Sequence, residues 1–275
     1  MTTGKEVRLQ KIWKHPRTVI IPYDHGSFGG PQPGIEDLLR LTDRIARTKA
    51  DGILVSAGVV QQIAPAVGTL GIIARLDGGF TKFGMELRDY QPMWSVPDAL
   101  KLGADAGIVF TFVGTPVEAI SMKRLGATAA DAHGWGLPLV AEIIPPSLLN
   151  NHFGTTIFPK ATKKASVHEE TMQVGRIGAE AGVDVIKTRY GGDREEFKRM
   201  VHSCGAKVIV AGGPAMGGGD DGVLNLAYEC VQADAHGIVF GRNVWQHPRM
   251  EKMIAALCAI VHEEEPVAQA RKLLR

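Results

Sequence analysis

The chain has 275 residues, of which 45% are hydrophobic and 22% charged, and its formal net charge is +2. This composition is typical of a folded protein with room for one large domain. The small net charge, without a basic cluster, gives no reason to expect a nucleic acid or a membrane as partner. Three scattered cysteines exclude a disulfide framework, and the first residues lack the apolar core of a signal peptide. We therefore expect a cytoplasmic protein.

Short apolar runs alternate with amphipathic stretches along the whole chain. We expect strands at 18–23, 52–56, 71–76, 106–112, 137–144, 183–188, 207–211 and 237–241. Helices are expected at 36–49, 97–102, 116–134, 166–181, 194–204, 221–233 and 249–263. This alternation predicts right-handed βαβ units and a parallel sheet. Eight strands predict a single-domain (β/α)₈ barrel over 1–275. The alternative is an open doubly wound sheet, but no strand-to-helix turn carries its glycine fingerprint.

Lys187 ends one of these apolar runs and precedes a polar stretch that contains Arg189. In either fold the chemistry is expected at the carboxyl ends of the strands. Burial there disfavours the charged form of an amine, and a neutral amine can attack a carbonyl group to form a Schiff base. The alternative is a lysine that only ends its strand and pairs with a carboxylate.

Acidic residues at other strand ends are candidates for proton transfer. Glu142 is flanked by apolar residues, and strand alternation predicts that it faces the barrel interior beside Lys187. We expect burial to raise its pKa, so that it acts as general acid or base; a plain ion pair is the alternative. Asp24 would transfer protons near Lys187 or orient a substrate hydroxyl group. The alternative is that it only caps the loop that follows its strand. Asp77 and His25 are weaker candidates for substrate contact, since a turn residue is the favoured interpretation of Asp77 and a hydrogen-bonded scaffold histidine that of His25.

The last two strands end in glycines that predict an anion site. Gly212 and Gly213 follow one strand, and Gly241 and Arg242 end the next. Glycines expose backbone N–H groups to an anion, and arginine offers a bidentate donor for phosphate. In barrels the loops after strands seven and eight often hold phosphate. Histidines and carboxylates have no convincing metal spacing, so neither a metal nor a cofactor is expected.

Four short motifs carry a resemblance to a known family. They are Tyr-Asp-His-Gly at 23–26, Asp-Val-Ile-Lys-Thr at 184–188, Ala-Gly-Gly-Pro at 211–214 and Gly-Arg-Asn-Val-Trp-Gln at 241–246. Over nearly its whole length the chain resembles archaeal-type class I fructose-bisphosphate aldolases. The phrase Gly-Lys-Glu-Val-Arg-Leu at 4–9 and the form of the lysine motif are similar to the 2-amino-3,7-dideoxy-heptulosonate synthase branch. That branch joins a sugar-derived fragment to aspartate semialdehyde.

The resemblance implies a metal-independent aldolase that assembles into a homo-oligomer and makes or cleaves a C–C bond in a phosphorylated ketose. It implies that Lys187 forms the Schiff base, that Asp24 acts beside it, and that the glycines at the last two strand ends and Arg242 hold the phosphate.

One position departs from the pattern. These families place a proton-transferring tyrosine just before a proline on strand five, where this chain has Ile144. Either Glu142 takes over that task or the reaction differs. Autoinducer phosphate thiolases, which also lack the tyrosine, use a lysine adduct to pass an acetyl group to coenzyme A. A lysine-dependent transferase of that type and a non-catalytic phosphosugar-binding barrel are therefore alternatives to the aldolase.

Overall fold

Eight parallel strands close into a barrel in the computed structural model, which describes residues 2–79, 81–84, 90–153, 165–213 and 218–275. The strands are β1 (Thr18–Pro22), β2 (Gly52–Ser56), β3 (Gly71–Arg75), β6 (Ala106–Thr111), β7 (Leu139–Ile143), β8 (Val185–Arg189), β9 (Lys207–Ala211) and β10 (Gly237–Val239). Each pairs with the next barrel strand, and β10 closes on β1. The predicted (β/α)₈ barrel is confirmed.

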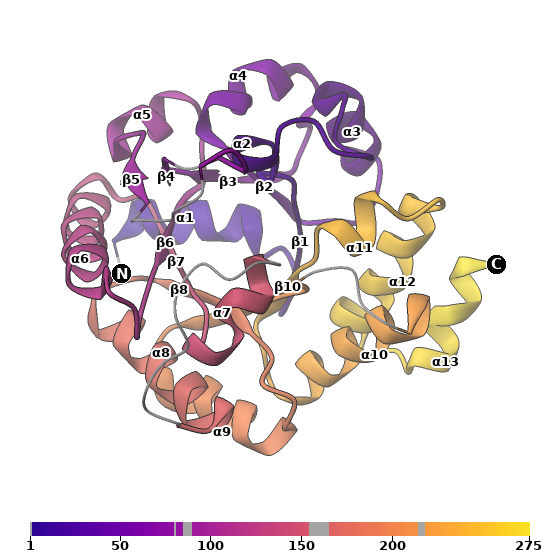
Figure 1. The fold of residues 1–275 in the computed structure, drawn as a ribbon. Helices are drawn as coiled ribbons and strands as arrows, with labels where there is room; N and C mark the ends of the chain where they lie inside the picture. The colour runs from indigo at the N-terminus through magenta and orange to yellow at the C-terminus, as the bar shows by residue number, and fades with distance from the viewer. Residues whose placement is uncertain (1, 80, 85–89, 154–164, 214–217) are drawn as a thin grey trace.

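Helices after the strands form an outer ring around the barrel (Figure 1). They are α3 (Leu38–Ala46), α4 (Val60–Ile63), α5 (Val96–Lys101), α6 (Glu118–Trp135), α8 (Val167–Glu180), α9 (Arg194–Cys204), α10 (Gly219–Gln232) and α12 (Met250–Glu263). Their apolar faces and the outward faces of the strands form the largest buried cluster. Because both faces of the strands are covered, the strand sequences are almost continuously apolar.

Shorter elements lie along the chain between the barrel strands and the helices of the outer ring, or after the last of these helices. They are α2 (Gly26–Gly29), α7 (Pro146–Phe153), α11 (Arg242–Trp245), α13 (Val267–Ala270), the two-residue strands β4 (Asp77–Gly78) and β5 (Gln91–Pro92), and the 3₁₀ turns Ala57–Val59, Ala64–Ala66 and Arg271–Leu274. The elements α2, α7 and α11 each follow the carboxyl end of a barrel strand, so they surround the mouth where a site is expected.

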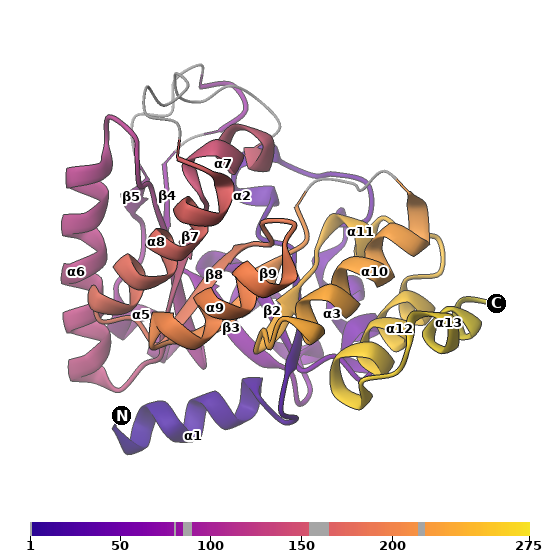
Figure 2. The same cartoon turned by 90° about the horizontal axis from the view of Figure 1, so that it is seen from below.

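A helix that the sequence patterns did not predict closes the other end of the barrel. It is α1 (Thr3–Ile12), which lies across the amino-terminal end of the strands (Figure 2). Its Leu9 and Ile12 join a buried cluster with the inward residues of the strands. The buried ammonium of Lys5 bonds to Asp184 at 2.7 Å and ties the helix to the barrel floor. Access to the interior is therefore from the carboxyl ends of the strands.

Inside the barrel an apolar layer supports a polar one. Ile73, Ile108, Val140 and Val185 belong to the cluster that α1 covers. Side chains on a strand alternate between its two faces. The residue two positions further along each strand therefore also points inward, one layer closer to the mouth.

Candidate active site

The polar layer of the barrel lines a cavity at its mouth. Two positions beyond the apolar layer lie Arg75, Phe110, Glu142 and Lys187, and all four line this cavity. The register pairs Glu142 of β7 directly with Lys187 of β8. The predicted inward direction and proximity of these two residues are confirmed. Their side chains are 2% and 7% exposed, so the charges meet almost without solvent.

Lys187 is held by a carboxylate, as its simpler interpretation predicted. Its Nζ donates to Oε1 of Glu142 at 2.6 Å. The cavity still reaches this side chain. The contact is therefore compatible with both interpretations, because a lysine that is oriented by a carboxylate and open to a cavity can also attack a carbonyl group.

Arg75, which the sequence analysis did not single out, organises the carboxylates of the site. Its guanidinium bonds to Asp24, to Asp77 at 3.2 Å and to Oε2 of Glu142. All of these side chains are buried. A buried cation is stable only when it is paired and hydrogen-bonded, and three acidic partners meet that need. In the sequence Arg75 follows an apolar run as Lys187 does, so the same signal marks it.

The expected pKa of Glu142 is wrong in direction. Burial by itself raises the pKa of a carboxyl group, as predicted. Here the charges of Lys187 and Arg75 outweigh burial and hold the pKa of Glu142 far below its usual range. Glu142 is therefore a fixed anion between two cations and cannot serve as a general acid near neutral pH. The prediction failed because it counted one cation beside this residue instead of two.

Asp24 and His25 both line the cavity, as their position after β1 predicted. Burial raises the pKa of Asp24, but the charges of Arg75, His25 and Lys187 together outweigh it and the net pKa is lowered. Nδ1 of His25 lies 3.5 Å from the Asp24 carboxylate. Burial lowers the pKa of His25 to about 4 against the opposing effect of Asp24. This corner therefore offers an ionised carboxylate and a neutral imidazole.

Asp77 lies outside the wall of the Lys187 cavity. Its carboxylate bonds to Arg75 and accepts from the backbone N–H of Phe110 at 2.6 Å. Burial raises its pKa to about 6, although Arg75 partly opposes this. Asp77 instead lines a neighbouring cavity with Tyr23 and Trp94. These contacts favour its interpretation as a structural residue over direct contact with a substrate bound to Lys187.

The predicted anion site lies on the rim of the same cavity. Gly213, Gly241 and Arg242 line it, and the guanidinium of Arg189 lies so close to Gly213 that a Cβ there would meet it at 1.9 Å. Burial lowers the pKa of both arginines, and the charge of Arg242 lowers that of Arg189 further. In the described part of the chain, Nη1 of Arg189 and Nε of Arg242 are buried without an acceptor. Two adjacent arginines without a carboxylate suit a dianion.

Gly212 differs from the other predicted phosphate residues. Its backbone N–H donates to the carbonyl of Val239 at 3.2 Å within the barrel wall, so this amide is already used. A Cβ at this position would meet the ring of Phe240 at 2.9 Å. The glycine is explained by close packing and not by anion contact. Pro214, the last residue of its motif, lies outside the described residues.

Aromatic side chains form part of the cavity wall. Tyr90, Phe110 and His152 line the cavity, and the rings of Tyr90 and Phe110 lie 5.4 Å apart. Ile144, at the position of the family tyrosine, is buried in the apolar cluster that contains both rings. Two residues of this wall were not predicted from the sequence: Tyr90 follows no expected strand, and His152 lies on the unpredicted helix α7.

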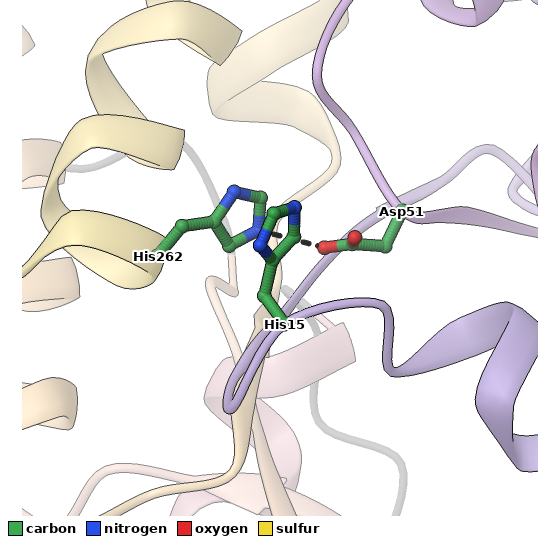
Figure 3. Close-up of side chains that lie close together, drawn as sticks. All are labelled: His15, Asp51 and His262. Carbon is green, nitrogen blue, oxygen red and sulfur yellow. Dashed lines mark hydrogen bonds and ion pairs between the residues drawn. The ribbon is translucent and has the colours of Figure 1, made fainter.

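A cluster of possible metal ligands lies at the opposite, amino-terminal end. Ligand atoms of His15, Asp51 and His262 lie within 4.8 Å of one another (Figure 3). Nε2 of His262 bonds to Asp51 at 2.7 Å, and the two imidazole rings stack at 4.0 Å with an interplanar angle of 20°. A ring nitrogen binds metal in its ring plane, and one ion cannot lie in the planes of two rings that are stacked face to face at this distance. The arrangement fits a hydrogen-bonded clamp between α12 and the barrel floor.

Comparison with known proteins places the chain in a family. Residues 18–247 match the model of the DeoC/LacD family aldolases. The chain belongs to this family. A 2-amino-3,7-dideoxy-D-threo-hept-6-ulosonate synthase of Halobacterium salinarum is 32% identical over 265 residues, which cover 95% of this chain and 92% of that protein. No helix in the described ranges is long and apolar enough to cross a bilayer.

Solved structures agree with this membership. A Schiff-base-forming fructose-1,6-bisphosphate aldolase superposes with a TM-score of 0.80 at 26% identity, over 94% of this chain and all of that one. An archaeal fructose-1,6-bisphosphate aldolase whose catalytic lysine is bound to a carbinolamine intermediate gives a TM-score of 0.77 at 26% identity, with the same coverage. The chain is thus a member of a class I, Schiff-base aldolase family, and the predicted aldolase resemblance is confirmed.

Proposed function

We propose that this aldolase uses Lys187 as its Schiff-base nucleophile and acts on a phosphorylated ketose. One observation supports this above all: the buried amine of Lys187 and the guanidinium of Arg242 face the same cavity, and the guanidinium of Arg189 adjoins it at the lining residue Gly213. Within the described residues neither arginine has an acidic partner. An amine alone at this position would suit many ligands. Paired with a dianion site, it suits a substrate that has a carbonyl group at one point and a phosphate at another.

In this proposal the amine of Lys187 forms a C–N bond with the ketone carbon, and the carbonyl oxygen leaves as water. The resulting iminium accepts the electron pair of a neighbouring C–C bond, which allows cleavage. In the reverse direction the enamine attacks an aldehyde, for which the sequence resemblance suggests aspartate semialdehyde. A phosphate held by Arg189 and Arg242 would fix the reacting carbons relative to the amine.

Borohydride trapping tests this function. Reduction of the protein in the presence of dihydroxyacetone phosphate is expected to add the mass of the reduced ketone to the peptide that contains Lys187. Trapping should need neither coenzyme A nor added metal. The absence of any covalent mass gain would contradict the proposal and favour a binding protein. A strict requirement of turnover for coenzyme A would favour a thiolase-type transferase.

Replacing Arg242 by methionine should weaken phosphate binding while the chemistry continues. Loss of a hydrogen bond to a charged group removes about 1.5–3 kcal/mol, so we expect KM for a ketose phosphate to rise by roughly 10- to 100-fold with a smaller change in kcat. Arg189→Met should act in the same direction. Neither variant should affect an unphosphorylated ketose. Arg176→Met, which removes an exposed arginine paired with Glu180 on α8, is the control, and an equal effect there would argue against a phosphate site.

A further inference from the structure

His152 lies where the polar layer and the aromatic wall of the cavity meet. It belongs to α7, which lies over the mouth of the barrel after β7 (Figure 1). Its side chain is 16% exposed and lines the cavity. The ring centroids of His152 and Phe110 lie 5.9 Å apart. The imidazole is thus partly enclosed and still open to a ligand.

A single carboxylate oxygen links His152 to the amine. Oε1 of Glu142 accepts a hydrogen bond from Lys187 at 2.6 Å and lies 3.5 Å from Nε2 of His152. A substrate bonded to Lys187 would therefore be within reach of the imidazole. A carboxylate beside a histidine orients the ring and stabilises the imidazolium when it forms, as in catalytic dyads and triads.

The two carboxylates that line the cavity are less able to move a proton. Glu142 stays ionised between Lys187 and Arg75. The Asp24 carboxylate is bonded to Arg75. Burial lowers the pKa of His152 to about 3, with Glu142 opposing and the nearby cations contributing, so its resting form is the neutral base.

We propose that His152 transfers the proton of the C–C bond step, a role that rests on the Schiff-base function proposed above. In cleavage, the imidazole takes the proton of the hydroxyl group on the carbon beyond the scissile bond. That bond breaks, its electron pair passes to the iminium and forms an enamine, and the aldehyde leaves. The imidazolium then returns the proton to the enamine carbon. Water releases the ketone and regenerates the free amine, so atoms and charges balance.

Solvent exchange isolates this step. With dihydroxyacetone phosphate alone in D₂O, the parent protein should exchange deuterium into the carbon next to the carbonyl group, which nuclear magnetic resonance measures. His152→Gln should lower the exchange rate by about 10²- to 10⁴-fold, the usual contribution of a general acid or base. Borohydride should still label Lys187 in this variant, which also reports that the cavity is intact. His133→Gln, on the exposed face of α6, should behave as the parent.

The outcomes separate this inference from the proposed function. If the parent protein is not labelled at Lys187, the Schiff-base function itself fails. If labelling persists and His152→Gln exchanges at the parent rate, only the role of His152 fails. A labelled parent that exchanges no deuterium would also count against it. Loss of labelling in both His152→Gln and His152→Asn would assign the residue to adduct formation or to the shape of the cavity and would overturn the proton-transfer role.

Discussion

Replacing Lys187 by methionine is expected to abolish aldol cleavage while the barrel still folds. Removal of a covalent nucleophile lowers kcat by factors on the order of 10⁴ or more. The methionine keeps the length of the apolar stem, and Glu142 keeps Arg75 as its counter-charge. We therefore expect a stability loss of about 1–3 kcal/mol, below the roughly 3–5 kcal/mol of a buried charge left alone. Steady-state kinetics and thermal unfolding measure the two effects.

The floor of the barrel offers a matched control for this prediction. Lys5 is as buried as Lys187 and bonds to Asp184 at 2.7 Å, at the opposite end of the strands. Lys5→Met should therefore lower the free energy of unfolding and leave kcat/KM unchanged. Substantial cleavage activity in Lys187→Met, or an equal loss of activity in Lys5→Met, would remove Lys187 from the mechanism.

Much of this arrangement could be predicted from the sequence, because strand alternation is a local property. Apolar runs of five to eight residues separated by helical stretches gave the barrel, and the runs at 52–56 and 207–211 match β2 and β9 residue for residue. The two-residue period placed Glu142 on the inner face, and the neighbouring strand brought Lys187 beside it. Residues at strand ends are therefore predictable once the strand order is known.

Features that depend on segments distant in sequence could not be predicted in this way. The pKa of Glu142 is lowered by Lys187 and also by Arg75, which is 67 positions away in the chain. His152 reaches the cavity because α7 turns back over the mouth, and no periodic pattern marks a helix of eight residues after a proline pair. The helix α1 was missed because only Leu9 and Ile12 of its apolar residues pack against the barrel floor, too few for a helical pattern.

The cavity is more cationic on one side than its carboxylates can neutralise. Arg75 is paired with three carboxylates, and Lys187 is paired with one of these three, Glu142. Arg189 and Arg242, by contrast, make no ion pair within the described residues. A dianionic substrate would complete this charge balance at the rim. At the Lys187 end, by contrast, two cations meet three carboxylates, so no positive charge is left uncompensated, which suits a neutral carbonyl group. The division of charge thus supports a substrate oriented with its phosphate at the arginines and its ketone at the amine.

Glu142→Gln is expected to separate adduct formation from turnover. Glutamine fills the same space and removes one negative charge, while Arg75 keeps Asp24 and Asp77, so the fold should persist. Borohydride labelling of Lys187 should persist, because the amine itself is unchanged. His152 loses its counter-charge, so kcat should fall by about 10²- to 10³-fold.

The control is Asp105→Asn, which alters a buried carboxylate that pairs with Lys11 at the barrel floor. Parent-like kcat in Glu142→Gln would refute the link between these residues, and loss of labelling would mean that the carboxylate serves the nucleophile itself.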